Sequence, residues 1–340
     1  MKIVNWNIEW MNNWFSGNQS PSWGSGRLTA DEARTCAGRA AAVIDALEPD
    51  LLCIQEGPSA EPEMALFLGE FLSDCAGPRY EAIMGLDGGA QKLYALRRKD
   101  GKVAAMERAT DPATEALREL WDADVNGDMM LEGYDFTRLP LVVDVDPIGT
   151  PPVRVVILHT KSKYVHGGAA KWRDPARRQE FVVEALQARR RISAEGFRLR
   201  GYLDTLVADD PEARIVVTGD WNDGPGRDLF ERKYLTHNVA DIVLGSTFTP
   251  ELIFHHPLIS GVAPPALFTA RFDDFVDEVA DRPLLLDHFA VSPALRERVA
   301  GAGIAHDPFE AQVEGGGARR SERPSDHRPI WVDLSAPLAG

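Results

Sequence analysis

The chain has 340 residues, of which 44% are hydrophobic, and this composition is enough for a sizeable buried core. The formal net charge of −15 argues against a protein that coats nucleic acid through a broad basic surface. It does not exclude a phosphate substrate, because a bound divalent cation can dominate the electrostatics of one site.

The N-terminal residues predict a core strand. Residues 1–6 lack the basic start, apolar run and small-residue cleavage site of a signal peptide. No stretch approaches the roughly 20 apolar residues that span a bilayer, so we expect no stable membrane insertion. The cysteines, Cys36, Cys53 and Cys75, lack metal-type spacing and are typical of reduced thiols. These features predict a cytoplasmic protein, but they do not indicate its oligomeric state.

Short apolar runs recur along the chain and predict buried strands. Most of them are rich in Leu or β-branched residues and are bounded by polar turns. In chain order they are 3–8, 51–55, 93–96, 139–145, 153–158, 215–218, 284–291 and 330–334.

Helices are predicted between some of these strands. Thr29 and Glu32 have the spacing of a capping box, and apolar residues then recur at helical period until Pro49. Residues 177–191 and 198–207 predict two further helices. Strands mixed with helices indicate an α/β protein.

Three segments, 12–27, 122–133 and 224–282, are predicted as loops. None resembles a flexible linker between domains. Our interpretation is therefore one domain over 1–340, with loop insertions near 105–135 and 224–282.

Polar side chains interrupt or end the apolar runs. They are Asn7, Glu56, His159, Asp220, Asn222, Asp287, Asp326 and His327. A carboxylate against a buried strand costs free energy unless it is paired, hydrogen-bonded or bound to metal. Several such residues at strand ends suggest one shared cleft, and oxygen ligands suit a hard cation such as Mg²⁺ or Mn²⁺.

Five blocks of the sequence, in their order and spacing, resemble the endonuclease/exonuclease/phosphatase superfamily, which includes pancreatic-type deoxyribonuclease and exonuclease III-like repair enzymes. The blocks are Val4-Asn5-Trp6-Asn7-Ile8, Ile54-Gln55-Glu56, Thr218-Gly219-Asp220-Trp221-Asn222-Asp223, Leu286-Asp287-His288-Phe289 and Ser325-Asp326-His327-Arg328-Pro329. The resemblance implies a four-layer α/β sandwich, in which two mixed β-sheets pack face to face with helices outside. It also implies a metal-dependent phosphoesterase that hydrolyses P–O bonds with an activated water.

The resemblance implies a metal site and a catalytic pair. Glu56 is similar to the main metal carboxylate, Asn7 to the amide that supports the metal, and Asp326 to a second carboxylate on the metal side. His327 would be the catalytic histidine, and Asp287 would orient its ring.

The resemblance also implies residues that contact the phosphate. Asp220 and Asn222 would position the attacking water and hold a phosphate oxygen. Either Asp220 or His327 could be the base, and the sequence does not choose between them. His159 resembles the deoxyribonuclease-type branch, in which a second histidine meets the leaving group or the phosphate.

Two cationic residues are candidates for substrate binding. Arg138 matches a position whose arginine approaches the substrate phosphate, although a solvated arginine at a strand start is the alternative. Lys161 lies in the block that follows His159 and is a further candidate.

Two weaker patterns could indicate additional ions. The stretch from Asp122 to Asp128 resembles the start of an EF-hand calcium loop, but Gly133 stands where that pattern expects Glu. A structural Ca²⁺ and a simple acidic turn are the two interpretations. The pair His255 and His256 predicts a loop rather than a transition-metal site.

Three functions are compatible with the sequence. The first is a phosphodiesterase or nuclease acting on DNA or RNA, which the motifs and His159 favour. The second is a phosphomonoesterase or lipid-headgroup phosphodiesterase on the same scaffold, which the acidic composition favours. The third is a binding protein that has lost catalysis, and the completeness of the site argues against it.

Overall fold

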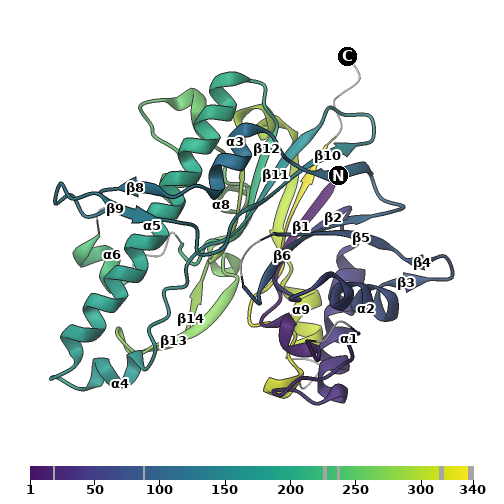
Figure 1. Ribbon diagram of the computed structural model, residues 1–340, viewed down its shortest axis with the longest axis horizontal. Coiled ribbons are helices and arrows are strands. Elements are labelled where there is room, and N and C mark those ends of the chain that lie inside the picture. The colour runs from purple at the N-terminus through teal and green to yellow at the C-terminus, as the bar shows by residue number, and fades with distance from the viewer. Residues whose placement is uncertain (18–19, 87–88, 225–227, 236–237, 314–317, 336–340) are drawn as a thin grey trace.

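Two mixed β-sheets form the centre of the computed structural model (Figure 1), which describes residues 1–17, 20–86, 89–224, 228–235, 238–313 and 318–335. Across the first sheet the strands are β16 (Val299–Ile304), β17 (Ile330–Leu334), β1 (Lys2–Asn7), β2 (Leu51–Gly57), β6 (Lys92–Arg98) and β5 (Tyr80–Met84). Across the second they are β15 (Asp287–Val291), β12 (Ile215–Asp220), β11 (Val153–His159), β10 (Leu141–Pro147) and β7 (Val103–Arg108).

Three short hairpins extend from this centre. They are β3 (Ser73–Asp74) with β4 (Gly77–Pro78), β8 (Trp121–Ala123) with β9 (Glu132–Tyr134), and β13 (Ala270–Asp274) with β14 (Val279–Leu284). In Figure 1 the β8–β9 and β13–β14 hairpins lie on the left, and β3–β4 lies on the right.

Helices lie against the outer faces of both sheets. On the side of the first sheet are α1 (Ala30–Leu47), α2 (Glu61–Phe71) and α9 (His306–Val313), and on the side of the second are α5 (Arg178–Asp209) and α7 (Val239–Leu244). The shorter helices are α3 (Pro112–Glu115), α4 (Gly168–Arg173), α6 (Leu229–Tyr234) and α8 (Pro257–Gly261). The 3₁₀ turns are η1 (Met11–Trp14), η2 (Ala116–Arg118), η3 (Pro250–Leu252), η4 (Pro264–Ala266), η5 (Pro293–Arg298) and η6 (Arg320–Glu322).

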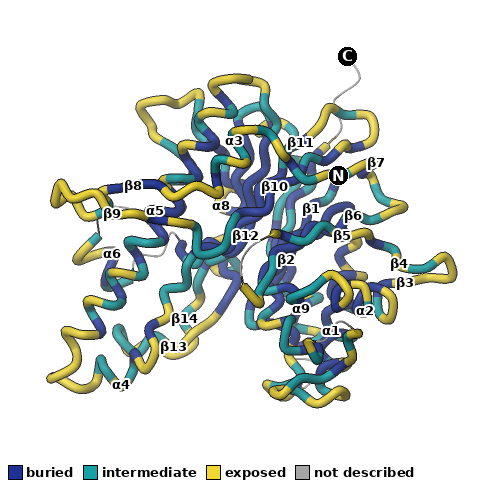
Figure 2. The backbone as a smooth tube through the Cα atoms, viewed as in Figure 1, coloured by how far each residue is buried: buried dark blue, intermediate teal, exposed yellow. Residues whose placement is uncertain are grey.

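The hydrophobic core has three layers, because both faces of each sheet are covered. Ile3 of β1 packs between the sheets with Val155 of β11, whereas its neighbour Val4 faces α1. Figure 2 shows the strands at the centre as the most continuously buried part of the chain. Strands buried on both faces read as unbroken apolar runs, which is the pattern of the sequence. The predicted four-layer α/β sandwich is confirmed.

Helix α1 begins at the predicted capping box. The Thr29 hydroxyl accepts a hydrogen bond from the amide of Glu32, and the Glu32 carboxylate accepts one from the amide of Thr29. The helix ends at Leu47, where Glu48 turns into the left-handed region with φ of 46° ahead of Pro49.

The two helices predicted at 177–191 and 198–207 are in fact one. Helix α5 runs without a break from Arg178 to Asp209, through Gly196. A Cβ added at this glycine would lie 2.6 Å from the Val239 side chain of α7. The residues between the two predicted helices therefore pack closely against α7. Tertiary contacts therefore decide the continuity of this helix, and local propensity does not.

The segments predicted as loops contain more structure than expected. Residues 224–282 include α6, α7, α8, β13 and the first part of β14, and 122–133 lie within the β8–β9 hairpin. The predicted strand at 284–291 is divided, because β14 ends at Leu284 and β15 begins at Asp287. In the described part of the chain no helix is both long and apolar enough to cross a bilayer.

We expect Thr29→Ala to lower the free energy of unfolding by about 1 kcal/mol, because the first turn of α1 loses its side-chain acceptor. Urea unfolding measures the change. Thr35→Ala in the same helix is the control, since its hydroxyl bonds only to the Asp31 carbonyl one turn earlier. An equal loss of stability in both variants would contradict the capping role.

Candidate active site

The polar residues expected at strand ends meet at one edge of the two sheets. β1 and β2 run parallel, as do β11 and β12, so the four carboxyl ends lie at this edge. β15 runs antiparallel to β12 and begins there. The register places His159 beside Asp220, and Asp220 beside Asp287. A hydrogen bond of 2.9 Å from Asn7 Nδ2 to Asp220 Oδ2 then joins the first sheet to the second.

Backbone conformations that side chains rarely adopt occur around this edge. Gly219 has φ of +144°, and a Cβ there would lie 2.0 Å from the Leu158 carbonyl oxygen. Glu56 has φ of 57° next to a register shift between β2 and β6, and Asn222 has φ of 51°. Left-handed conformations of non-glycine residues cost free energy, and they concentrate at functional sites.

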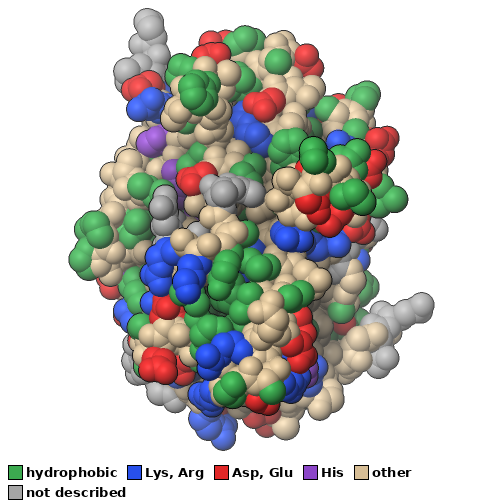
Figure 3. All heavy atoms as spheres, turned by 90° about the vertical axis from the view of Figure 1, so that its left-hand side faces the viewer, with side chains coloured by type: hydrophobic (Ala, Val, Ile, Leu, Met, Phe, Trp, Pro, Cys, Tyr) green, Lys and Arg blue, Asp and Glu red, His purple; other side chains and the backbone are tan. Residues whose placement is uncertain are grey.

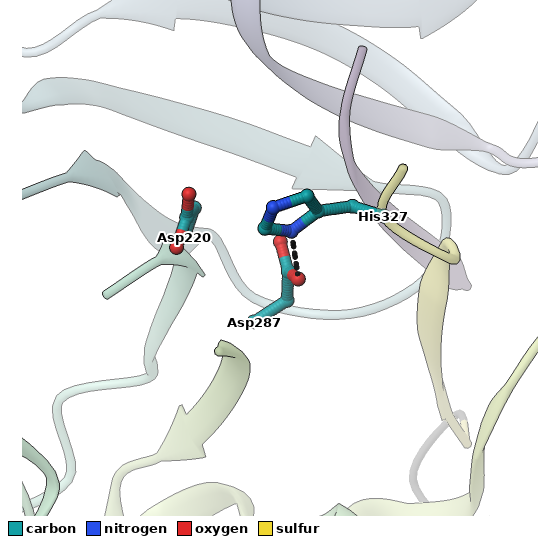
Figure 4. A group of neighbouring side chains, drawn as sticks. All are labelled: Asp220, Asp287 and His327. Carbon is teal, nitrogen blue, oxygen red and sulfur yellow. Dashed lines mark hydrogen bonds and ion pairs between the residues drawn. The ribbon is translucent and has the colours of Figure 1, made fainter. Parts of the chain in front are cut away.

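A buried histidine–aspartate pair lies at the centre of the site (Figure 4). His327 Nδ1 and Asp287 Oδ2 are 2.7 Å apart and share a hydrogen bond. Asp220, Asp287 and His327 each offer a ligand atom, and these atoms lie within 4.8 Å of one another. Asp287 arises from β15, whereas His327 precedes β17 in the other sheet, so the pair spans the two sheets.

The loop that carries His327 is bound to the end of β1. The Trp6 indole donates to the carbonyl of His327 at 2.7 Å. The Ser325 hydroxyl donates to the carbonyl of Asn7 and accepts from the amide of His327 at 2.8 Å. The imidazole is therefore held by the backbone on one side and by Asp287 on the other.

The buried charges in this group shift one another's pKa. Burial raises the pKa of Asp220; the charge of His327 opposes this rise and that of Asp287 adds to it. Burial alone would lower the pKa of His327, but the Asp287 and Asp220 carboxylates outweigh it and hold that pKa well above its ordinary value. The geometry therefore favours the imidazolium form of His327.

Asp220 is fixed by amide donors on both oxygens. Its Oδ1 accepts from the backbone amide of Asn222 at 2.8 Å. Its Oδ2 accepts from Asn7 and, at 3.3 Å, from Asn222 Nδ2. The Asn222 amide group also donates to the Thr160 carbonyl at 3.2 Å, which fixes its orientation.

Glu56 and Asn7 offer oxygens that suit a divalent cation. Burial raises the pKa of Glu56, so its charged form is costly without a cation nearby. Asn7 Nδ2 lies 3.4 Å from Glu56 Oε1, and the buried Asn7 Oδ1 has no hydrogen-bond partner among the described residues. An unpaired buried oxygen beside a carboxylate fits a Mg²⁺-type ion.

Asp326 lies on the far side of His327 from Asp287. Its Oδ1 is 3.8 Å from His327 Nε2, and its side chain is 31% exposed. Among the residues that the structure describes, the tight carboxylate–imidazole group contains neither Asp326 nor Glu56.

His159 is buried and neutral. Burial lowers its pKa well below the ordinary value, and the charges of Arg138 and His327 lower it further. Its Nε2 lies 3.6 Å from Asp220 Oδ2 and 3.8 Å from Glu56 Oε1. Within the described part of the chain its Nδ1 has no hydrogen-bond partner.

Arg138 is linked to Glu56 by hydrogen bonds through Gln91, a residue that the sequence pattern did not indicate. Its Nη2 donates to Gln91 Oε1 at 2.9 Å, and the Gln91 amide group donates to Glu56. Its Nη1 donates to the Thr160 carbonyl at 3.2 Å. Lys161 does not join this group: its Nζ donates to the Ser162 carbonyl at 3.2 Å, and its side chain lines a neighbouring pocket.

Glu195 of α5 is a second residue that the sequence did not indicate. Its two carboxylate oxygens accept from the amides of Thr137 and Lys161, at 2.8 and 2.9 Å. These amides belong to the segments that carry Arg138 and His159. A glutamate within a helical pattern predicts a surface residue, so no local signal identified this buried contact.

The acidic stretch from Asp122 to Asp128 lies in the turn of the β8–β9 hairpin, whereas an EF-hand has a helix on each side of its loop. Asp124 accepts from the amides of Gly127 and Met129, and Asp128 accepts from that of Met130. The carboxylates thus stabilise the turn itself. The structure favours the acidic turn over the calcium loop.

The two packed mixed sheets form an α/β sandwich with this buried group at their shared edge. No protein-family model matches the sequence, and no curated protein matches it significantly. Solved structures, however, match it over nearly its whole length.

Three of these structures are informative. An endonuclease/exonuclease/phosphatase from Beutenbergia cavernae is 18% identical with a TM-score of 0.54, over 100% of this chain and 73% of its own. The 3′-5′ exonuclease NExo from Neisseria meningitidis is 15% identical with a TM-score of 0.52, over 98% of this chain and 100% of its own. A mannosyl-6-phosphatase from Bacteroides thetaiotaomicron is 16% identical with a TM-score of 0.50, over 98% and 99%. These likenesses confirm the fold that the motifs predict.

We expect Gly219→Ala to lower the free energy of unfolding by about 2 kcal/mol or more, because its Cβ overlaps the Leu158 carbonyl and its φ is unfavourable. Urea unfolding measures the loss. Gly201→Ala in α5 is the control, because nothing lies within 4 Å of its Cβ position. That variant should be stabilised by up to about 1 kcal/mol, as a helical glycine replaced by alanine. A Gly219→Ala protein as stable as wild type would contradict the close packing.

His256, predicted as part of a loop pair, forms a buried hydrogen-bonded chain beside the site. Its Nδ1 accepts from the Ile259 amide at 3.3 Å, and its Nε2 lies 2.9 Å from His288 Nδ1. His288 Nε2 lies 2.6 Å from the Asp223 carbonyl oxygen, which can only accept. One proton on each ring satisfies this chain, so both histidines are neutral. Burial lowers the pKa of His256 and of His288.

Stability should therefore fall as the solution becomes acidic. Below about pH 6.5, the ordinary pKa of an unfolded histidine, the unfolded chain binds protons that folded His256 and His288 do not. His256→Gln removes one of the two histidines that gain a proton on unfolding. We therefore expect the free energy of unfolding to fall less steeply between about pH 7 and pH 5, by up to about 1.4 kcal/mol per pH unit. Unfolding at a series of pH values measures this slope. The exposed His166→Gln is the control, and an unchanged slope in His256→Gln would contradict the neutral pair.

Proposed function

We propose that this chain is a divalent-metal-dependent phosphoesterase, and specifically a phosphodiesterase that hydrolyses P–O bonds with an activated water. The observation that carries the proposal is the His327–Asp287 pair, 2.7 Å apart, beside the buried Asp220. Hydrolysis of phosphate esters also fits the fold, since proteins that share it are named as an exonuclease and a phosphatase.

Glu56, Asn7 and Asp326 would hold the metal ion. All three offer oxygen ligands, which Mg²⁺ or Mn²⁺ prefers, and Asn7 Oδ1 has no partner in the described structure. When bound, such an ion supplies positive charge that polarises a phosphoryl oxygen. Its binding would also offset the burial cost of the charged Glu56 carboxylate.

Asp220 and His327 are the proton-handling groups in this proposal. His327 Nδ1 is hydrogen-bonded to Asp287. Its Nε2 is therefore the ring nitrogen that would donate a hydrogen bond to a phosphate oxygen or to the leaving group. The surrounding carboxylates favour the imidazolium, which donates a hydrogen bond where negative charge develops. Asp220, oriented by Asn7 and Asn222, accepts the proton of the attacking water.

Arg138, His159 and Asn222 would hold the phosphate from the other side. Arg138 brings a partly buried positive charge near Glu56 and Asp220, whose charges oppose the lowering of its pKa by burial. Neutral His159 has Nε2 3.6 Å from Asp220 Oδ2, and its Nδ1 has no hydrogen-bond partner in the described structure. These donors suit an anionic substrate in a site that also contains several carboxylates.

A phosphomonoesterase is the second candidate. The observation in its favour is the likeness to a mannosyl-6-phosphatase, which has a TM-score close to that of the exonuclease. The two functions differ in whether the substrate phosphate carries one ester group or two.

A substrate panel tests the proposed function. It contains plasmid DNA, single-stranded DNA, RNA, bis-p-nitrophenyl phosphate and p-nitrophenyl phosphate, each with Mg²⁺, with Mn²⁺ and with EDTA. We expect hydrolysis of the diesters with Mg²⁺ or Mn²⁺ and its loss in EDTA. Hydrolysis of the monoester alone would select the phosphomonoesterase.

The variants His327→Ala and Glu56→Gln test the roles of these residues. His327→Ala should lower kcat about 10²–10⁴-fold by removing a proton donor. Glu56→Gln should weaken metal binding, so that activity requires a higher Mg²⁺ concentration. Wild-type rates in both variants, at every metal concentration, would overturn the assignment of the site.

A further inference from the structure

A pocket of about 470 Å³ lies beside the candidate active site. Residues of the segment 161–166, of β9 and of α5 line it, and several of these side chains are cationic or aromatic. They are Lys161, Tyr164, His166, Tyr134, Arg190 and Arg191. Two glutamates also line the pocket, but the Glu132 carboxylate accepts from the Tyr134 hydroxyl and that of Glu184 pairs with Lys171. Figure 3 views the side of the molecule on the left of Figure 1, where Lys and Arg side chains lie next to hydrophobic ones.

The pocket shares its wall with the active site. Lys161 follows Thr160, whose carbonyl accepts from both Arg138 and Asn222 at 3.2 Å. Glu195 binds the amide of Lys161 with one oxygen, and it binds the segment that carries Arg138 with the other. The pocket and the Arg138 contact thus share one short segment, residues 160–161.

Two cations in the pocket have no carboxylate partner in the described part of the chain. The Lys161 amino group bonds to a backbone carbonyl, and the Arg190 guanidinium has neither a hydrogen bond nor an ion pair there. In a chain with a net charge of −15, unpaired cations that share a pocket indicate an anionic ligand. Burial and the charge of Arg138 both lower the pKa of Lys161, and a bound anion would relieve this cost.

Tyr164 presents an exposed ring on a well-anchored segment. Its side chain is 72% exposed, whereas the next residue, Val165, is buried against Phe181 of α5. On the other side, the Lys161 amide is bound by Glu195. A flat aromatic ring held at the mouth of a cationic pocket is a stacking surface for a base.

We propose that this pocket binds a nucleotide unit next to the scissile phosphate, with Lys161 and Arg190 at its phosphate and Tyr164 against its base. The inference rests on the proposed function, which supplies the scissile phosphate, and it names single-stranded polynucleotide as the substrate class. A sugar phosphate or a lipid headgroup offers an anion but no base to stack on Tyr164.

Binding without turnover tests this inference directly. The His327→Ala protein, in EDTA, is titrated into a fluorescent single-stranded oligonucleotide of about eight nucleotides while anisotropy is recorded. Adding Tyr164→Ala or Arg190→Gln should raise Kd about tenfold, whereas Tyr164→Phe, which keeps the ring, should stay within about twofold. An abasic oligomer of the same length should bind more weakly than the oligonucleotide.

The matched controls are Arg34→Ala on α1 and Phe248→Ala, an exposed aromatic residue between α7 and η3. Both should bind like the parent protein. Equal affinity of the Tyr164→Ala and parent proteins, or of the abasic and natural oligomers, would overturn the nucleotide pocket.

Turnover separates this inference from the proposed function. In the otherwise wild-type protein, Tyr164→Ala should lower the kcat/KM for the oligonucleotide relative to that for bis-p-nitrophenyl phosphate by about tenfold. An enzyme that cleaves bis-p-nitrophenyl phosphate but neither binds nor cleaves the oligonucleotide retains the proposed function and refutes the pocket. A protein that binds the oligonucleotide through Tyr164 yet hydrolyses no ester retains the pocket and refutes the proposed function.

Discussion

The hydrogen bond between Asn7 and Asp220 shows the constraint on which the site depends, namely the relative placement of two sheets. Each residue ends a strand in its own sheet, and the packed hydrophobic layer between the sheets sets how far apart those ends lie. Because side chains alternate along a strand, a slip of one residue would turn Asp220 to the opposite face. The geometry of His327 and Asp287, which also spans the sheets, is subject to the same constraint.

Burying carboxylates at this site costs free energy, and hydrogen bonds from fixed polar groups offset that cost. Asp220 receives amide donors on both oxygens, while Glu195 binds two backbone amides from separate segments. Preorganised groups of this kind need little rearrangement when charge develops on a substrate. The long helix α5 therefore contributes to the site without placing a residue in its centre.

The sequence predicts the central strands well, because strands buried on both faces appear as plain apolar runs. It also identifies Asn7, Glu56, Asp220, Asp287 and His327, because polar side chains at the ends of such runs are conspicuous. Their convergence at one edge is seen in the structure, but their chemical roles stay predictions. Contacts between distant elements could not be predicted: the link from Gln91 to Glu56, the burial of Glu195 and the continuity of α5 depend on tertiary packing. The stretch from Asp122 to Asp128 resembled a calcium loop for a related reason. A calcium loop requires a helix on each side, and the short motif alone does not show whether those helices are present.

The pairing of β17 with β1 has a consequence for the order in which the site forms. His327 reaches the site only when β17 has docked against β1, a strand that lies far from it along the chain. Closing so large a loop is entropically costly, which slows the formation of such contacts. A chain that has already folded its other strands but has not docked β17 would still lack the imidazole beside Asp287.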